Sequence, residues 1–145
     1  MNTEANKTLA RSYLSALDRH DIDAAVALVT PDLVNHTAIP EAQGAEGMRR
    51  ILAKMHKAFP DQRLTCDDVI AEGDRVVCRV TTRGTHTGPL EFVRWPAPPT
   101  GKAVTTTAIH VFRIADGKIA EHWGAMDAFA MLRQLGLTPR PEVHS

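Results

Sequence analysis

The spacing of apolar residues changes near residue 62, and this change limits the folds that the chain can adopt. Before it, apolar side chains such as Leu9, Tyr13 and Leu17 recur every fourth residue, which is the period of a helix with one buried face. After it, apolar and polar residues alternate, as over residues 76–81, which is the period of a half-buried strand. Helices followed by consecutive antiparallel strands predict an α+β fold, with a curved sheet wrapped around the first helix.

Local start and stop signals place the expected elements along the chain. Asn2 or Thr3 and Asp21 carry side chains that cap helix N-termini, while Pro31 and Gly136 stand where helices are expected to end. The expected helices cover residues 4–19, 22–30, 45–58 and 128–135, and the expected strands cover residues 33–36, 64–70, 76–82, 102–114 and 118–126.

The first hairpin turns at Glu72-Gly73-Asp74. We predict a three-residue loop, because this register pairs Ile70 with Val76 and gathers the apolar residues on one face. Asp68 then lies on the apolar face and is a second candidate for a functional carboxylate. A bond to a neighbouring backbone group or cation is the other interpretation of Asp68.

The second hairpin turns at Asp116-Gly117, a strong signal for a two-residue loop. Its predicted register pairs His110 with Trp123 and Thr106 with Asp127, so all four side chains share one face. That face is apolar near the turn and polar further along. An apolar concavity with a few convergent polar groups is typical of a small-molecule pocket.

Asp127 is the carboxylate that we expect to do chemistry. Burial in an apolar cavity would raise its pKa toward the range that suits a general acid or base. The alternative is a structural role, because Asp127 precedes the last expected helix and Asp is a common N-cap. The two roles are compatible.

The seven histidines divide by their expected surroundings. His36, His86 and His110 can face a cavity, although each is also consistent with a buried structural histidine. No HxH, HxxxH or HExxH spacing occurs, so we predict no metal site. The other four histidines are expected away from the pocket, three in solvent and the last on the outer face of the sheet, namely His20, His56, His144 and His122.

Composition narrows the possible partners. Seventeen basic and seventeen acidic residues give a net charge of zero, which argues against nucleic acid and membrane surfaces. The outer face of the sheet also carries apolar residues, including Ile109 and Val111, so we predict a homodimer. A neutral, weakly polar carbonyl compound suits the sparsely charged cavity. Aromatic residues are scarce, and those considered as substrate contacts are Tyr13, Phe59, Trp95 and Trp123.

The chain is expected to form a single domain over residues 1–145, with a core of about 6–137 and a tail of 138–145. It shows no signal peptide and no apolar run long enough to span a bilayer, and Cys66 and Cys78 are expected as reduced thiols, so we expect a cytoplasmic protein. Residues 88–101, with four prolines and Trp95, form either a binding loop or lid, or a tolerated surface insertion.

Several segments, spread in colinear order over residues 6–137, resemble the SnoaL-like polyketide cyclases of the nuclear transport factor two fold superfamily. The segments that carry this resemblance are Asp32-Leu33-Val34-Asn35-His36, Ala58-Phe59-Pro60-Asp61, Ile70-Ala71-Glu72-Gly73-Asp74-Arg75-Val76-Val77, Gly84-Thr85-His86-Thr87-Gly88, Pro98-Pro99-Thr100-Gly101-Lys102 and Asp116-Gly117-Lys118-Ile119-Ala120-Glu121-His122-Trp123.

The resemblance implies a cone-shaped α+β barrel, usually dimeric, that encloses a pocket. It implies ring closure of a polyketide intermediate by intramolecular aldol condensation, without metal or cofactor. Asp127 matches the family's acid/base and His110 matches a histidine that lines its pocket. His110, with His36 or His86, would then donate hydrogen bonds to enolate or alkoxide oxygen. The loop at 89–97 is longer than the family's usual link.

Two other functions remain open from the sequence. One is an isomerase or hydrolase on the same fold, although an epoxide hydrolase of this kind needs an Asp–Arg–Asp cluster and no inward-facing Arg partner of Asp127 can be identified. The other is a non-catalytic pocket that binds a small hydrophobic molecule.

Overall fold

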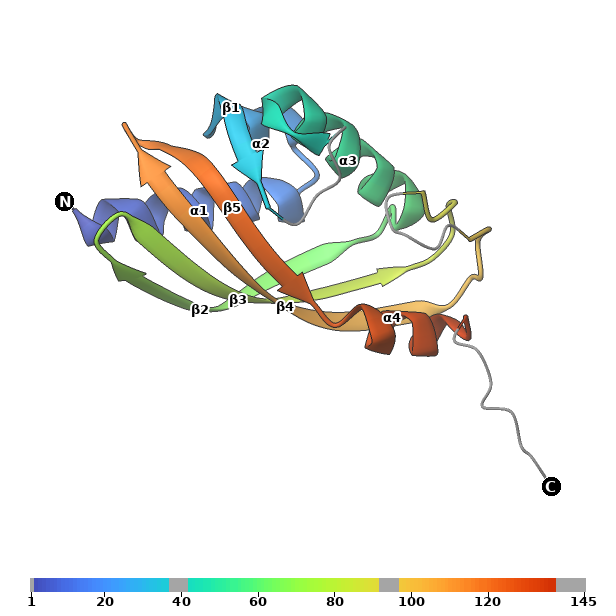
Figure 1. Cartoon of the computed structure of the whole chain (residues 1–145). Coiled ribbons are helices and arrows are strands. Elements are labelled where there is room, and N and C mark those ends of the chain that lie inside the picture. The colour runs from blue at the N-terminus through green and yellow to red at the C-terminus, as the bar shows by residue number, and fades with distance from the viewer. Residues whose placement is uncertain (1, 37–41, 92–96, 138–145) are drawn as a thin grey trace.

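A curved five-stranded sheet and four helices make up the computed structural model, which describes residues 2–36, 42–91 and 97–137 (Figure 1). The strands lie in the order β1-β5-β4-β3-β2, with β1 parallel to β5 and the other neighbours antiparallel. The α+β prediction is confirmed, and the sheet is open rather than closed. The elements are α1 (Thr3–Asp18), α2 (Ile22–Val26), β1 (Val29–Asn35), α3 (Gly44–Ala58), β2 (Arg63–Glu72), β3 (Arg75–Thr85), β4 (Ala103–Ala115), β5 (Lys118–Met126) and α4 (Ala128–Leu135).

The capping signals of the sequence mark helix ends correctly, but Pro31 does not, because α2 already ends at Val26. Asn2 and Asp21 cap α1 and α2 by accepting hydrogen bonds from Ala5 N and Ala24 N. Gly136 ends α4 in the left-handed conformation, with φ of 73°. Strand β1 starts earlier than expected and includes Pro31, which its place at the edge of the sheet permits. No helix in the described part of the chain is long and apolar enough to cross a membrane.

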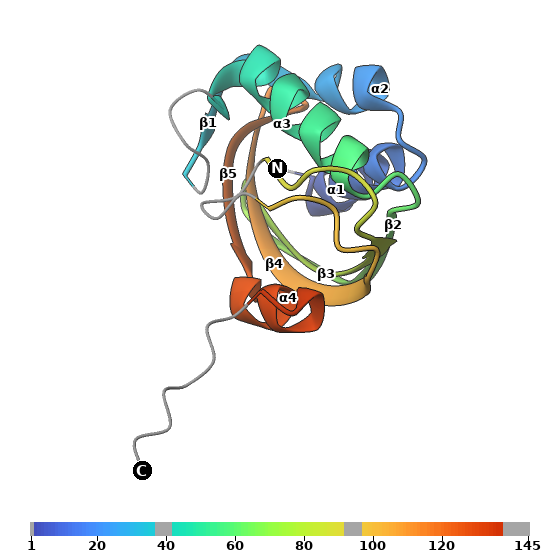
Figure 2. The same ribbon diagram turned by 90° about the vertical axis from the view of Figure 1, so that its right-hand side faces the viewer.

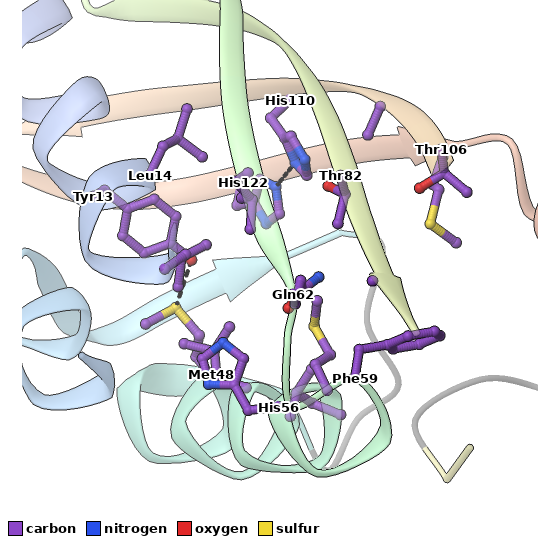
Figure 3. Close-up of a pocket in the computed structure, with 18 of the residues that line it drawn as sticks. Tyr13, Leu14, Met48, His56, Phe59, Gln62, Thr82, Thr106, His110 and His122 are labelled. Atoms are coloured by element: carbon purple, nitrogen blue, oxygen red, sulfur yellow. Dashed lines mark hydrogen bonds between the residues drawn. The ribbon is translucent and has the colours of Figure 1, made fainter. Parts of the chain in front are cut away.

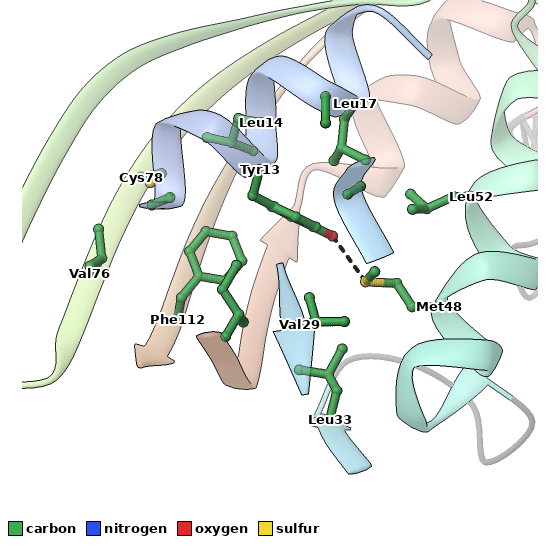
Figure 4. Close-up of a cluster of buried hydrophobic side chains, with 14 of the residues drawn as sticks. Tyr13, Leu14, Leu17, Val29, Leu33, Met48, Leu52, Val76, Cys78 and Phe112 are labelled. Atoms are coloured by element: carbon green, nitrogen blue, oxygen red, sulfur yellow. Dashed lines mark hydrogen bonds between the residues drawn. The ribbon is translucent and has the colours of Figure 1, made fainter. Parts of the chain in front are cut away.

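Helices α1, α2 and α3 lie on the concave side of the sheet, and Figure 2 shows the sheet curling around α1. The main hydrophobic core of the protein joins α1 and α3 to the inner face of β3, β4 and β5 (Figure 4). At its centre, the rings of Tyr13 and Phe112 meet edge to face at 5.5 Å. The Tyr13 hydroxyl donates to Met48 Sδ at 3.2 Å, which ties α1 to α3.

The first hairpin differs from its predicted register. Glu72 pairs with Arg75, so the loop has two residues, and a bulge at Asp67 restores the expected pairing of Cys66 with Val80. The predicted inward position of Asp68 is therefore wrong. Its carboxylate lies on the outer face and accepts a hydrogen bond from Arg79 Nε at 2.7 Å, which is the alternative that the sequence left open.

The second hairpin keeps its predicted register only beside the turn. Ile114 pairs with Ile119 as expected, but a bulge places Ala120 as an extra residue in β5. Beyond the bulge His110 pairs with Gly124 instead of Trp123. Because side chains alternate between faces, one extra residue exchanges the faces of the rest of the strand.

A second, smaller core lies where α4 packs against the start of β4 and the end of α3. The base of the 88–101 loop is anchored there: Gly88 N donates to Ala58 O, and Leu90 is fully buried and forms a bridge with Ala97. Residues 92–96, with Trp95, and the tail of 138–145 fall outside the described residues, so the lid hypothesis for this loop stays a prediction.

Candidate active site

A cavity of about 190 Å³ lies between α1, α3 and the concave face of β3, β4 and β5 (Figure 3). This volume exceeds the roughly 150 Å³ of an engineered protein cavity that holds benzene, so it has room for a ring-sized part of a ligand. The described residues that line it are Tyr13, Leu14, Leu17, Asn35, Met48, Ile51, Leu52, Met55, His56, Phe59, Gln62, Leu64, Thr82, Gly84, Val104, Thr106, Ala108, His110, Phe112, His122, Met126 and Met131.

The described wall of the cavity is mostly apolar and holds no Asp, Glu, Lys or Arg. Its titratable side chains are those of Tyr13, His56, His110 and His122. Burial raises the pKa of Tyr13, so its phenol stays neutral. A charged ligand group would find no opposite charge on this part of the wall. A neutral molecule with a few polar groups fits it better, because the wall offers apolar surface and a few hydrogen-bonding groups.

His110 and His122 form a hydrogen-bonded pair in the cavity wall (Figure 3). His110 Nδ1 and His122 Nε2 lie 2.8 Å apart, and each ring stacks against Phe112. Burial lowers the pKa of His110. Burial first, and then the electrostatic effects of the neighbouring His110 and His36, lower the pKa of His122 to about 3. Both rings are therefore neutral at pH 7, and one N–H is shared between them.

Gly124 gives the two imidazoles the space to meet. It pairs with His110 across the strands, and a Cβ atom at this position would lie 3.1 Å from His110 Nδ1 and 3.2 Å from His122 Nε2. These are the two nitrogens that share the hydrogen bond. Any side chain at position 124 would therefore make close contacts with both nitrogens and disturb their hydrogen bond.

Further polar groups lie across the cavity from this pair. Gln62 is almost fully buried, and its Oε1 has no hydrogen-bond partner among the described residues. His56, at the end of α3, stacks on His20 with ring centroids 4.0 Å apart. Burial, with a smaller effect of His20, lowers the pKa of His56 to about 4. The expectation that His56 is fully solvated is wrong, because it forms part of the cavity wall.

Asp127 lies outside this cavity wall as the structure describes it. Its side chain is exposed and caps α4, with Oδ1 accepting a hydrogen bond from Ala130 N at 2.9 Å. It lies three residues beyond Gly124, the partner of His110, and directly follows Met126, which lines the cavity. The structural role that the sequence offered as an alternative is thus present; a catalytic role stays a prediction.

His36 and Trp123 lie together on the convex face of the sheet. Their rings stack at 4.6 Å, and Arg75 covers the Trp123 ring at 4.7 Å. His36 Nε2 donates to Glu121 Oε2 at 2.5 Å. Neither residue lines the described cavity. The predicted inward position of Trp123 and outward position of His122 are both wrong, because the bulge at Ala120 exchanges the two faces of β5.

The other predicted contacts divide between the cavity and the loop. Tyr13 and Phe59 line the cavity, as expected for substrate contacts. His86 is fully buried in a different place, where its Nδ1 bonds the Thr100 hydroxyl at 2.9 Å and its backbone bonds Gly101 and Lys102. His86 therefore holds the two ends of the loop together. The position of Trp95 is outside the described residues.

Sequence reasoning missed His122 and Gln62 as cavity residues. A period of two identifies faces only until a bulge occurs, and the sequence Lys118-Ile119-Ala120-Glu121 carries no Gly or Pro that would signal one. Gln62 stands between an expected helix and strand, where sequence patterns do not fix a side-chain direction.

Comparison with known proteins identifies the family of this chain. The family model of the SnoaL-like polyketide cyclases matches residues 7–135. The chain belongs to this family. Among the curated relatives, the aklanonic acid methyl ester cyclase DnrD of Streptomyces peucetius is 28% identical over 139 residues, which cover 92% of this chain and 93% of DnrD.

Solved structures of other proteins have a fold similar to that of this chain. TsrD from Streptomyces laurentii has a TM-score of 0.84 at 29% identity, over 95% of this chain and 99% of that chain. AclR from Streptomyces galilaeus, a candidate hydroxylase, has a TM-score of 0.81 at 30% identity, over 96% of this chain and 89% of that chain. The family and fold expected from the sequence motifs are confirmed.

Proposed function

We propose that this SnoaL-like protein is a cofactor-independent cyclase that closes a ring in a small, uncharged, hydrophobic carbonyl compound of the polyketide type. The reaction would be an intramolecular aldol condensation or a related reaction of a carbon acid, in the cytoplasm. The observation that carries the proposal is an apolar cavity whose described wall lacks formal charge and contains the hydrogen-bonded pair of His110 and His122.

The chemistry follows from what an aldol closure requires. A proton must leave a carbon next to a carbonyl group, and a proton must reach the oxygen that becomes an alkoxide. Neutral imidazoles suit both steps, since each ring has one nitrogen that accepts and one that donates. The N–H of His110 or His122 would stabilise the developing enolate in a cavity with little competing water.

Asp127, which the sequence predicted as the acid/base, is the alternative to the histidine pair as the group that transfers protons. Its position next to Met126 would let it act at the edge of the cavity, while its exposure and its bond to Ala130 N favour the capping role. The two assignments predict different losses of activity for substitutions at positions 110 and 127.

The direct test uses aklanonic acid methyl ester, the compound named in the curated relatives. The purified protein is incubated with the ester without metal or cofactor, and the products are separated by liquid chromatography and mass spectrometry. We expect a product of unchanged mass with a new retention time, because aldol ring closure that ends with protonation of the alkoxide, without loss of water, is an isomerisation. A variant of the convex face, Arg79→Gln, should act as the wild type does.

A binding measurement separates the cyclase from a non-catalytic binder. Four of the five methionines, Met48, Met55, Met126 and Met131, line the cavity, so ¹³C-methyl methionine spectra report directly on its occupancy. Shifts of these methyl signals without turnover of the ester would favour the binder. Neither shifts nor turnover would contradict the proposed class of substrate.

An isomerase or hydrolase on the same fold remains the second candidate class. A hydrolase that opens an epoxide with an Asp–Arg–Asp cluster would need these side chains in the cavity, and the described wall contains neither Asp nor Arg. Incorporation of ¹⁸O from labelled water into the product would nevertheless identify a hydrolase at once.

The proposal includes a homodimer formed through the convex face. Ile109 and Ile70 are 44% and 65% exposed there, and Val111 lines the same groove as Ile70. Burying such side chains favours association. Light scattering should give twice the chain mass of 15.9 kDa. A mass of one chain at micromolar concentration would contradict the dimer.

A further inference from the structure

The hydrogen bond between His110 Nδ1 and His122 Nε2 links two residues that both line the cavity, and it leaves a second nitrogen on each ring. Since both rings are neutral, only two protons are distributed over the four nitrogens. One proton lies in the shared bond. One ring therefore offers an acceptor at its other nitrogen, and the partner ring offers a donor there.

We infer that His122 is a second catalytic residue, and that His110 and His122 together transfer a proton from the carbon acid of the substrate to the newly formed alkoxide. This inference rests on the proposed function and deepens it, because it assigns both proton transfers of ring closure to one pair of side chains. The sequence placed His122 on the outer face and gave it no role in the reaction.

The atoms and charges of the step balance without any other reactant. In the tautomer where His122 Nε2–H donates to His110 Nδ1, His122 Nδ1 takes the proton from the carbon. The shared proton then moves to His110 Nδ1, and His110 Nε2–H gives its proton to the alkoxide as the new carbon–carbon bond forms. The opposite tautomer results, and exchange with water restores the first one after the product leaves.

Three structural features favour a relay over two independent histidines. The 2.8 Å separation is short enough for proton transfer within the bond. Gly124 keeps this contact free of a side chain. Phe112 stacks on both rings and fixes their orientation, with centroids 6.0 Å and 5.1 Å away.

The electrostatic surroundings also keep the pair neutral. Among the described residues, the titratable groups that line the same cavity, pair with His110 or act on His122 are Tyr13 of α1, His56 of α3, Cys78 of β3 and His36, which follows β1. Burial raises the pKa of Cys78 to about 12, so its thiol carries no charge at neutral pH. On β5 itself, Glu121 points to the convex face and bonds Arg113 and His36. The described residues that line the cavity include no carboxylate that would favour an imidazolium.

The first test observes the pair in the wild-type protein by ¹⁵N nuclear magnetic resonance. We expect a coupling across the hydrogen bond between His110 Nδ1 and His122 Nε2, and two protonated and two unprotonated nitrogens at pH 7. Doubly protonated rings at pH 7, or the absence of the coupling, would overturn the inference. This outcome does not depend on turnover or on any substitution.

The second test compares His110→Gln, His122→Gln and the double variant on aklanonic acid methyl ester. Each single substitution should lower kcat by about 10²–10⁴, the usual contribution of acid–base catalysis. The double variant should be worse than the poorer single variant by less than about threefold, because members of one unit are not additive. The control Arg79→Gln should stay within about twofold of the wild type, as expected for a distant surface site.

The outcomes separate this inference from the proposed function. No turnover by the wild type would contradict the proposed function. In that case the ¹⁵N coupling would still show that His110 and His122 share a hydrogen bond. Turnover by the wild type that His122→Gln leaves unchanged would overturn the role of His122 alone. Methionine methyl spectra of each variant confirm that the cavity is intact before its rate is interpreted.

Discussion

The two faces of β5 expose neighbouring side chains to opposite conditions. His122 lies on the concave face, where burial keeps it neutral and its partner is a second neutral imidazole. Glu121 lies on the convex face, where hydrogen bonds from Arg113 and then His36 lower its pKa and hold it charged. Charge is thus removed by burial on one face and compensated by pairing on the other.

The largest expected difference between the faces concerns stability. Phe112 is 1% exposed at the centre of the concave face, whereas Ile109 is 44% exposed on the convex face of the same strand. Phe112→Ala should lower the free energy of unfolding by about 3–5 kcal/mol through lost contacts and a cavity. Ile109→Ala should change the free energy of unfolding of the single chain by no more than about 0.5 kcal/mol, so the two variants are compared at a concentration where the chain is monomeric. Urea unfolding measures both, and similar losses would show that the faces are not distinct.

Acid should destabilise the concave face before it affects the convex one. The folded-state pKa of His122 lies at about 3, below its ordinary value of 6.5, so the unfolded chain binds this proton more readily. Stability should therefore fall as pH drops below 6.5, down to about 3. For His122 alone the loss between pH 7 and pH 5 is about 2 kcal/mol.

Two variants, His122→Gln and Glu121→Gln, test whether the concave face loses stability at a higher pH than the convex face. His122→Gln should keep roughly 2 kcal/mol more of its pH 7 stability at pH 5 than the wild type does. The lowered pKa of Glu121 stabilises the fold above its ordinary value of 4.5, and this contribution is lost as pH falls through the folded-state pKa. Glu121→Gln should therefore follow the wild type between pH 7 and 5. Equal acid sensitivity of wild type and His122→Gln would refute the assignment.

A smaller effect, on the rate of ring closure, is expected when a methyl group is added to β5 at Gly124. In Gly124→Ala the added methyl meets both nitrogens of the histidine pair at 3.1–3.2 Å, closer than ordinary contacts. Ring closure should slow by about tenfold, corresponding to roughly 1.4 kcal/mol, and the coupling between the rings should weaken. Ala125→Val enlarges the neighbouring, exposed residue and serves as the matched control. If Gly124→Ala keeps the full rate, contact between the rings is not needed for catalysis.

The smallest effect concerns Asp127, at the end of the same strand. Asp127→Ala removes the cap of α4 and should cost about 1 kcal/mol of stability, while Asn, itself a good cap, should restore most of it. Thermal unfolding of the two variants measures the difference. An Asn variant as unstable as the Ala variant would mean that the negative charge of Asp127, rather than its capping geometry, stabilises the helix.

The sequence predicted the fold better than the site, and the reason is physical. Helix caps depend on local residues such as Asp21 and Gly136, so their positions could be predicted directly from the sequence. The face of each strand residue depends on an unbroken register. A bulge at Ala120 and another at Asp67 each shift that register by one residue.

The consequences of these bulges fall mainly on the site. His110 lies in β4, whose alternation continues without interruption, and its inward position was predicted correctly. His122 and Trp123 follow the bulge and exchange faces. Trp95 lies outside the described residues, so its predicted contact with a substrate stays open.

The most direct test of the account measures ring closure of aklanonic acid methyl ester by His110→Gln and Asp127→Asn side by side with the wild type. The account places proton transfer in the cavity wall, so His110→Gln should lose about 10²–10⁴ of kcat while Asp127→Asn keeps it within about threefold. The reverse result, a large loss for Asp127→Asn with His110→Gln unaffected, would contradict the account and assign the acid–base role to the end of β5.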